Sequence, residues 1–316
     1  MRTAAVAALV TPATMALVIA CEPAPDPAGP KLQAMSFANS EWSDPANLGA
    51  TINTPANEQG PSLSNDGLSL YFGSDRDGGS GSFDLWVAHR ACRDCPWDAP
   101  VNLGASVNSA ASETGPGLSV DGHLLFFTST RAGSQDLYLS HRADPKDDLG
   151  WEPPVALGPG VNTSANEAGA EYLQNAEEGT VNFYFNRAPA GGPADIYSAS
   201  LTRDGETLGP AVAVVELNDP TATDQGVSLR KDGREIFFFS TRPGGLGGND
   251  LWTSSRSNAN DPWSAPTNLG APVNSSAADQ QPNVTFDGRT LLFASNRTGG
   301  FGGTDIWMST RTPSGH

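Results

Sequence analysis

A five-fold internal repeat of about 55 residues constrains this chain more than any other feature of its sequence. One unit consists of an outer segment at 97–104, a segment at 113–122, a run at 124–131 and a run at 135–142. The runs are short, rich in Leu, Phe and Tyr, and bounded by Gly, Asp and Asn, and no ten-residue stretch has helical periodicity. A strand-only repeat of this period predicts a β-propeller.

The strand count predicts how the ring closes. Asp-Gly pairs such as Asp121-Gly122 mark hairpins between inner and middle strands, and each unit adds a third and an outer strand. The chain begins with an outer strand and ends without one, so 42–49 should pair with 305–311. We therefore expect an all-β, five-bladed β-propeller of four-stranded antiparallel blades, closed by the N-terminal outer strand; six blades is the alternative.

The third unit is irregular. It has 171–179 where the others carry a Ser-x-Asp-Gly type of turn, and it lacks Trp-x-x-Pro in the outer segment at 208–212. Either this unit drifted or it was specialised. Its carboxylates Glu171, Glu177 and Glu178 are the only sequence sign of a differentiated site.

The N-terminal residues have the composition of a secretion signal. Arg2 precedes an Ala/Val/Leu-rich run that ends at Cys21, and the residues before Cys21 resemble the lipobox of bacterial lipoproteins. We predict a signal peptide at 1–20, a lipidated Cys21, a Pro/Ala-rich tether at 21–41, the propeller at 42–311 and a tail at 312–316. Ordinary cleavage nearby is the alternative. Glu22 is not the aspartate that retains such proteins in the inner membrane, which favours the outer membrane.

The formal net charge of −17 argues against direct binding of nucleic acid or of an anionic membrane surface. Any membrane contact is expected through the N-terminal lipid alone. The acidity also has a simpler explanation, which is solubility of a secreted protein.

Two positions carry the same residue in all five units, and we interpret them as structural pairs that fix one hairpin per blade. Catalysis is the alternative, but an active site needs differentiated residues. The arginine follows the middle strand and the aspartate opens the third strand: Arg76 and Asp84, Arg131 and Asp136, Arg187 and Asp195, Arg242 and Asp250, Arg297 and Asp305. An aromatic residue two positions after each aspartate is expected to pack within the blade.

An acidic residue precedes each inner strand, and the strand order places this set around one mouth of the central channel. The set is Glu58, Glu113, Glu167, Asp224 and Asp279. Such charges repel unless a cation, ordered water or a backbone amide offsets them. Carboxylate and carbonyl oxygens suit Ca²⁺, so calcium is a possible cofactor, although none is certain and the metal is unknown.

Gly-rich connections at 244–250 and 299–305 resemble a calcium-binding nonapeptide only superficially, because the aspartate is one place late and the motif is not in tandem. They are better interpreted as hairpins with the apolar tips Leu246 and Phe301, which with the acidic set form a candidate binding face. The alternative is that each tip folds back onto its own blade.

Cys92 and Cys95 form the only Cys-x-x-Cys, and we predict a disulfide in an oxidising envelope. Zinc needs two more ligands, of which His89 supplies at best one, and redox catalysis favours a helix start that is missing here. Metal binding and free or redox-active thiols are the alternatives.

The Asp-Gly turn, the Leu-x-Phe-x-Ser-x-Arg middle strand, the Gly-rich link and the Asp-[Leu/Ile]-[Tyr/Trp] third strand resemble the WD-repeat-like repeats of the TolB propeller family. They also resemble repeats that accompany OmpA-type domains in envelope proteins. The resemblance covers roughly 42–311 and implies fold rather than function. The proline that TolB-type repeats place before Asp-Gly is absent here, and no OmpA-like domain follows Arg311.

These observations predict a monomeric, lipid-anchored interaction module of the cell envelope, whose partner is an envelope protein, a peptide or a glycan. The alternative is an enzyme, because five-bladed propellers include glycoside hydrolases with differentiated carboxylates around the channel. No Ser/His/Asp constellation is evident in the sequence, since His89 and His141 are equivalent positions in successive units.

Overall fold

A computed structural model describes residues 37, 40–174 and 181–313 of the chain. The predicted signal peptide, Cys21, most of the tether, Glu177, Glu178 and the last three residues lie outside the described residues. The blades belong to the compact unit that spans Ser36–His316.

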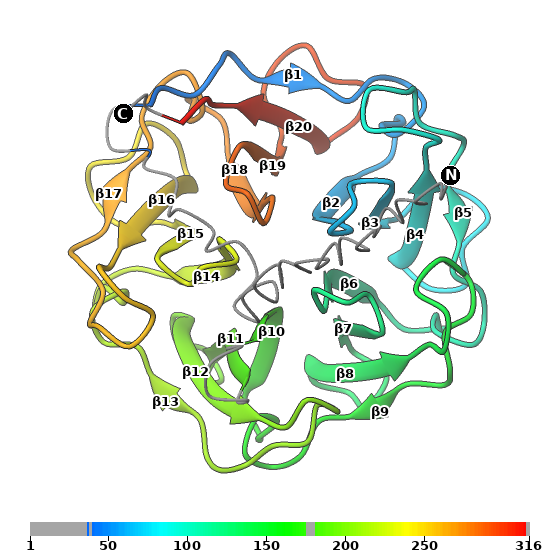
Figure 1. The fold of residues 1–316 in the computed structure, drawn as a ribbon, viewed down its shortest axis with the longest axis horizontal. Helices are drawn as coiled ribbons and strands as arrows, with labels where there is room; N and C mark the ends of the chain where they lie inside the picture. The colour runs from blue at the N-terminus through cyan, green and yellow to red at the C-terminus, as the bar shows by residue number, and fades with distance from the viewer. Residues whose placement is uncertain (1–36, 38–39, 175–180, 314–316) are drawn as a thin grey trace, which may run out of the picture. The chain divides into compact units, whose positions relative to one another are not determined.

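Five four-stranded antiparallel sheets surround a central channel, as predicted (Figure 1). Blade 1 contains β2 (Glu58–Leu63), β3 (Ser69–Ser74), β4 (Asp84–His89) and β5 (Val101–Asn102). Blade 2 contains β6 (Glu113–Leu118), β7 (Leu124–Ser129), β8 (Asp136–His141) and β9 (Val155–Ala156). Blade 3 contains β10 (Asn166–Gln174), β11 (Val181–Ala188), β12 (Asp195–Leu201) and β13 (Val212–Ala213). Blade 4 contains β14 (Asp224–Leu229), β15 (Glu235–Ser240), β16 (Asp250–Ser255) and β17 (Thr267–Asn268). Blade 5 contains β18 (Asp279–Val284), β19 (Thr290–Ser295), β20 (Asp305–Thr310) and β1 (Ala46–Asn47).

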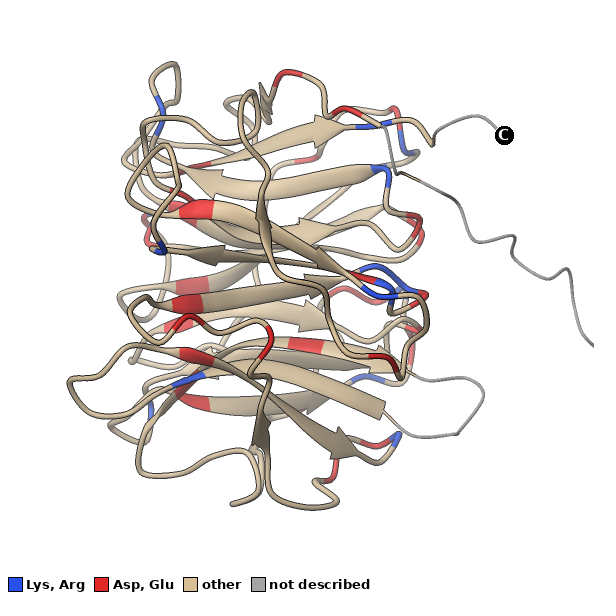
Figure 2. Cartoon of the chain, turned by 90° about the vertical axis from the view of Figure 1, so that its left-hand side faces the viewer, with Lys and Arg blue, Asp and Glu red and all other residues tan. Residues whose placement is uncertain are grey.

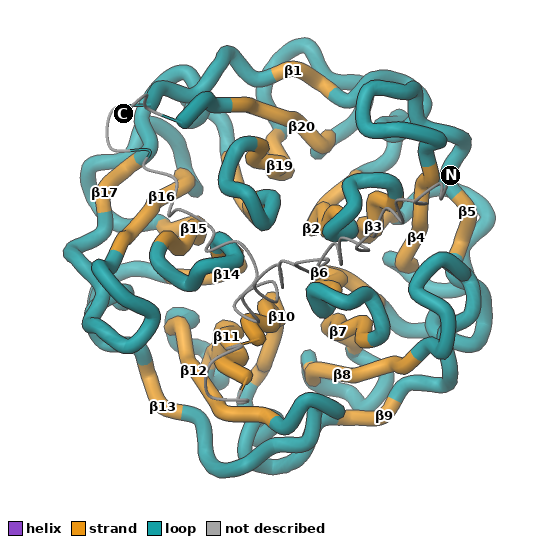
Figure 3. The backbone as a smooth tube through the Cα atoms, in the orientation of Figure 1, coloured by secondary structure: helices purple, strands orange, loops and turns teal. Residues whose placement is uncertain are grey.

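The ring closes through the N-terminal outer strand, which confirms the predicted closure. β1 pairs with β20 in the register Ala46↔Met308 and Asn47↔Trp307, and the Ser43 amide donates to the Thr310 carbonyl at 2.8 Å. Figure 3 shows β1 at the rim beside β20. Blade 5 therefore joins both ends of the propeller, so no blade edge is left unpaired at the seam.

The strand registers define two faces of the ring. Glu58 pairs with Ser74, and Ser74 pairs with Asp84, so the starts of inner and third strands lie together with the Gly-rich loops. We call this side the Gly-loop face. The opposite side carries the Asp-Gly turns, and we call it the Asp-Gly face. Seen edge-on in Figure 2, acidic residues lie at strand ends and in loops on both sides of the sheets.

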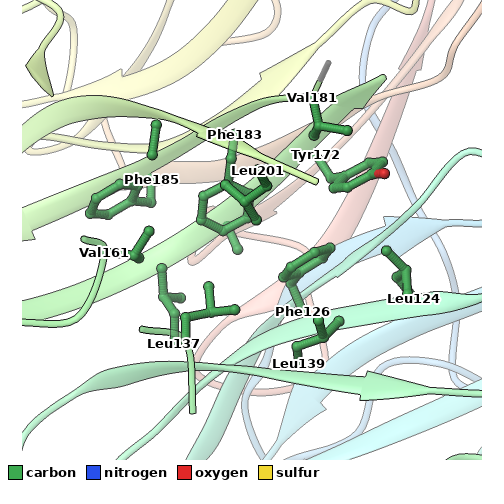
Figure 4. Close-up of a cluster of buried hydrophobic side chains, with 13 residues drawn as sticks. Leu124, Phe126, Leu137, Leu139, Val161, Tyr172, Val181, Phe183, Phe185 and Leu201 are labelled. Carbon is green, nitrogen blue, oxygen red and sulfur yellow. The ribbon is translucent and has the colours of Figure 1, made fainter. Parts of the chain in front are cut away.

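Blade 3 departs from the other blades in length and packing. β10 has nine residues where the inner strands of the other blades have six, so Glu171 lies within a strand and not in the turn predicted for it. Phe126 of blade 2 packs against Tyr172 and Phe183 of blade 3, with ring centroids 5.4 and 5.0 Å apart. Figure 4 shows these rings in the cluster that joins the two blades. The irregular blade is therefore well anchored to its neighbour.

Candidate functional site

The five acidic residues that begin the inner strands are fully buried and paired with arginine. Each has no exposed surface. The pairs are Arg76 with Glu58 at 3.0 Å, Arg131 with Glu113 at 3.1 Å, Arg187 with Glu167 at 2.8 Å, Arg242 with Asp224, and Arg297 with Asp279 at 2.5 Å. The prediction that these five residues belong to a binding face is therefore wrong, because each carboxylate is enclosed within its own blade.

Blade 1 shows how one such carboxylate is satisfied. Oε2 of Glu58 accepts the Thr54 amide at 2.9 Å, and Oε1 accepts the hydroxyls of Thr54 and Ser74 at 2.7 and 3.0 Å. The guanidinium of Arg76 adds the compensating charge and also donates to the Ile52 carbonyl at 2.6 Å. The backbone amide anticipated as an offset is thus present, with the arginine beside it.

The predicted arginine–aspartate pairs across each hairpin are wrong. The arginine turns toward the inner strand, and its guanidinium stacks on the aromatic residue of the third strand, as Arg76 does over Trp86 at 5.3 Å. Asp84 instead accepts the Ser80 and Gly81 amides at 2.5 and 3.0 Å. Asp250 and Asp305 bind their loops in the same way. The physical reason is that Gly-rich loops offer free amides to the nearest carboxylate.

The other two third-strand aspartates lack this loop. Asp136 accepts only the Ser134 hydroxyl, at 3.2 Å, and no hydrogen bond to the Asp195 carboxylate is found among the described residues. Burial and the nearby charge of Asp224 raise the pKa of Asp195, and burial and Glu167 do the same for Asp136. Loop amides therefore stabilise the ionised aspartate in blades 1, 4 and 5, whereas burial disfavours it in blades 2 and 3.

The apolar tips Leu246 and Phe301 lie half-exposed on the Gly-loop face, with 53% and 50% of their surface accessible. They do not fold back onto their blades, which was the alternative. The loop bases are fixed instead, because a Cβ at Gly247 or Gly302 would lie 1.9 Å from the carbonyl oxygen of Ala277 or Ala56. Two adjacent blades therefore present one exposed apolar side chain each from rigid loops.

The central channel is narrow, with a volume of about 80 Å³, far below that of typical ligand pockets. Backbone closes it: Gly60, Gly115, Gly169 and Gly226 all have positive φ at equivalent bulges. A Cβ at Gly60 would lie 3.0 Å from the Gly115 Cα, so a side chain does not fit there. At the equivalent position Gln281 has a φ of 51° and accepts the Gly60 amide at 3.0 Å.

Glu171 is the only carboxylate among the described residues that line this channel. Its Oε1 accepts the Leu229 amide across the seam between blades 3 and 4 at 2.9 Å. Burial raises the pKa of Glu171 to about 8, although the amide acts in the opposite direction. Ser228 and Asn283 occupy the equivalent position in blades 4 and 5, and each accepts a backbone amide of the next blade in the same way. Glu171 therefore makes a hydrogen bond that recurs between blades, but it does so with a carboxyl group.

A Ser/His/Asp grouping that the sequence did not suggest joins blades 1 and 2. The Ser69 hydroxyl lies 2.7 Å from Asp148 Oδ2, and His89 Nδ1 lies 3.3 Å from that hydroxyl and 3.4 Å from Asp148. A catalytic triad uses opposite ring nitrogens for serine and aspartate, whereas a single nitrogen faces both here. The grouping therefore ties two blades together and does not activate the serine.

Sequence reasoning also missed a second set of arginines, located after the third strands. Each donates Nε to the carbonyl of the Asp-Gly glycine and stacks on a tryptophan: Arg90 on Trp97, Arg142 on Trp151, Arg256 on Trp263 and Arg311 on Trp42. The signal was present, since four units have arginine directly after the third strand. In blade 3 the equivalent position is Leu201, which is buried.

The structure joins Cys92 and Cys95 in a disulfide, as the sequence predicted. Within 40–174 and 181–313, no group of three or more His, Cys, Asp or Glu side chains is placed to hold a metal ion. The described part of the chain contains no helix long and apolar enough to span a membrane.

No protein-family model matches the sequence, and no curated protein matches it. Solved structures do match. An alpha-L-arabinofuranosidase from Lactobacillus brevis has a TM-score of 0.57 and 14% identity, covering 82% of this chain and 92% of that chain. A GH62 hydrolase in complex with xylotriose has a TM-score of 0.58 and 9% identity, covering 88% and 98%.

Similarity at these identities shows a shared fold, and fold does not imply function. A putative TolB from Agrobacterium tumefaciens matches with a TM-score of 0.48 and 18% identity, covering 83% of this chain and 79% of that chain. This weaker likeness carries no argument. The comparisons therefore agree with the five-bladed architecture and leave function to the site.

Proposed function

We propose that this chain is a non-catalytic binding module whose Gly-loop face contacts a protein or peptide partner through Leu246 and Phe301. One observation carries this proposal: every acidic residue at the inner-strand start is buried and neutralised within its own blade. The acidic residues and arginines that recur in all five blades therefore stabilise the fold. The loop tips differ between blades, and two of them expose large apolar side chains.

We further propose that the module is anchored in the cell envelope through a lipid on Cys21, in the outer membrane. The lipobox-like sequence supports this, and the position of Phe37 agrees with it. The ring of Phe37 stacks on Arg311 at 3.9 Å and lies beside the Gly288 turn. Phe37 therefore lies against the Asp-Gly face of the propeller.

The test is partner recovery from detergent-solubilised envelope with a Leu246→Asp/Phe301→Asp variant. We expect the variant to lose the partner while its melting temperature stays unchanged, because both side chains are exposed. The matched control is Val155→Asp/Val212→Asp, which changes two valines that are 68% and 65% exposed on the outer strands. Recovery that survives the tip changes, or is lost equally in the control, would contradict the proposal.

The anchor is tested separately by replacing Cys21 with Ser and fractionating cells. We expect the variant to leave the membrane fraction. A variant that stays as membrane-bound as the parent would contradict lipidation. That result would not bear on the binding face, which the Leu246→Asp/Phe301→Asp variant tests.

Glycoside hydrolysis is the second candidate, and two observations favour it. The neighbours in fold include an alpha-L-arabinofuranosidase and a hydrolase solved with xylotriose, and Glu171, with a pKa of about 8, is a carboxyl held protonated at neutral pH. A glycosidase also needs a second carboxyl group about 5–10 Å away. Arabinoxylan and xylotriose cleavage by the parent, abolished by Glu171→Gln, would establish this function; no cleavage would exclude it for these substrates.

A further inference from the structure

The two faces of the ring differ in the charges that their connections carry. The connections of the Gly-loop face are 48–57, 103–112, 157–165, 214–223 and 269–278 before the inner strands, and 75–83, 130–135, 189–194, 241–249 and 296–304 before the third strands. Apart from the shared arginines, which are already paired with buried acids, their only charged residues are Asp75, Asp77, Glu216 and Asp219. The surplus charge of these connections is therefore entirely negative.

The Asp-Gly face is mixed in charge. Every Lys and Arg of the described residues outside the shared set lies in its connections or just after β20, and these connections also carry aspartates (Figure 2). A partner with basic residues is therefore attracted to the Gly-loop face more than to the opposite one.

The negative charge of Asp75 is not required by the fold. Its Oδ1 accepts the Asn57 amide at 2.7 Å. Neutral residues accept the equivalent amide at 2.9–3.1 Å in three other blades: Thr130, Thr241 and Asn296. Asp77 also has neutral counterparts in these blades: Ala132, Pro243 and Thr298. Both aspartates are exposed, so blade 1 presents two charges that the scaffold does not use.

These two aspartates lie beside the Phe301 tip. A Cβ at Gly303 would lie 2.5 Å from Asn57 Oδ1, so the loop that carries Phe301 rests against Asn57. Asn57 donates its backbone and side-chain amides to the two oxygens of Asp75 at 2.7 and 2.9 Å. Asp75 and Asp77 therefore flank Phe301 on the side of blade 1.

The other two acids lie on the far side of the tips, beside Leu246. Glu216 and Asp219 belong to the connection 214–223, whose last amide donates to the Thr241 hydroxyl at 3.0 Å, where the Leu246 loop begins. Hydrogen bonds from Thr221 lower the pKa of Asp219, so this carboxylate is charged at neutral pH. Because blades 4, 5 and 1 follow one another in the ring (Figure 1), the order is acid, Leu246, Phe301, acid.

We propose that the partner of the Gly-loop face is a basic peptide segment in which Lys or Arg residues stand on both sides of apolar ones. The apolar residues contact Leu246 and Phe301, and the basic residues pair with Asp219 at one end and with Asp75 and Asp77 at the other. An acidic segment is repelled at both ends. This inference rests on the proposed binding face and specifies the chemistry of what it binds.

The experiment selects a random peptide library displayed on phage against the parent protein. A parallel selection on Leu246→Asp/Phe301→Asp removes peptides that do not need the tips. We expect the remaining peptides to carry Lys or Arg on both sides of apolar residues. Fluorescence anisotropy then gives the affinity of a synthetic copy of one enriched peptide, which should fall as salt is added.

Two charge variants locate the contact. Asp75→Asn/Asp77→Asn should weaken binding of this peptide roughly three- to tenfold at low salt, because two exposed ion pairs are lost. The variant should fold normally, since Asn296 fills the position of Asp75 in blade 5. The matched control, Asp94→Asn/Asp98→Asn, removes the same net charge from exposed residues of the Asp-Gly face and should leave the affinity unchanged.

The selection distinguishes failure of this inference from failure of the proposed function. Tip-dependent peptides without an excess of Lys and Arg would overturn the basic partner and leave the binding face in place. An equal loss of affinity in the two charge variants would do the same, because net charge alone would then explain the attraction. Absence of any tip-dependent peptide would contradict the binding face itself.

Discussion

Blades 3 and 4 are neighbours built from the same repeat, and they stabilise the same buried charge with different numbers of contacts. In blade 4, Arg242 binds Asp224, the Ser240 hydroxyl and the Leu217 carbonyl. In blade 3, Arg187 itself occupies the register position of that serine, opposite Glu167 and Asp195, and it keeps only Glu167 and the Val161 carbonyl. The pair of acid and arginine is retained when its supporting contacts are lost, which identifies it as the essential element of the repeat.

The two blades also differ at the third strand. Asp250 closes a Gly-rich loop through two amides, whereas Asp195 has no such loop and its pKa is raised. Blade 3 gains Glu171 in the channel instead. Departures from the repeat thus gather in one blade, where the shared scaffold has lost contacts and a new buried carboxyl has appeared.

The largest expected effect comes from removing the shared arginine in either blade. Arg242→Ala and Arg187→Ala each leave a fully buried carboxylate without its counter-charge, so each should lower the free energy of unfolding by about 3–5 kcal/mol. Urea denaturation measures this. The exposed Arg203→Ala should cost less than about 0.5 kcal/mol. A small loss in blade 3 alone would show that the pair is not essential there.

The second prediction concerns pH and Glu171. Burial raises the pKa of Glu171 from its ordinary value of 4.5 to about 8, so the folded state binds more protons than the unfolded state between these two pH values. Stability should therefore fall as pH rises from 4.5 to 8, by up to about 1.4 kcal/mol per pH unit, and level off above 8. Glu171→Gln should remove this pH dependence. The substitution should therefore leave the free energy of unfolding nearly unchanged at pH 5 and raise it at pH 8. Exposed Glu216→Gln serves as the control; an unchanged pH slope in Glu171→Gln contradicts the assignment.

The third prediction separates the observed pairing from the one suggested by sequence spacing. A double-mutant cycle on Arg242→Ala and Asp224→Asn should show a coupling of about 1–3 kcal/mol, because the two groups share one buried ion pair. The cycle on Arg242→Ala and Asp250→Asn should be additive within about 0.5 kcal/mol. Equal coupling in both cycles would restore the hairpin pairing.

The repeat was sufficient to predict the fold, since the strand count and the position of the first outer strand specify five blades and a closure through residues 42–49. It was insufficient to predict the site. Arg76 is eight positions from Asp84 but pairs with Glu58, 18 positions away, because the inner strand returns beside it. Asp84 binds backbone amides, which have no residue-type signature. The stacking of Arg256 on Trp263 and its hydrogen bond to the Gly233 carbonyl likewise join residues that are distant in sequence.

The smallest expected effect tests the third-strand aspartates of the two blades. Asp250→Asn removes a charged acceptor from the Leu246 and Gly247 amides, so it should cost about 1–3 kcal/mol and mobilise the loop that carries the Leu246 tip. Asp195→Asn should change stability by less than about 0.5 kcal/mol, or raise it, because burial and Asp224 already disfavour the ionised form. Thermal unfolding at pH 7 compares the two. A larger cost for Asp195 would mean that blade 3 stabilises this carboxylate by a contact outside the described residues, and the contrast between the blades would then disappear.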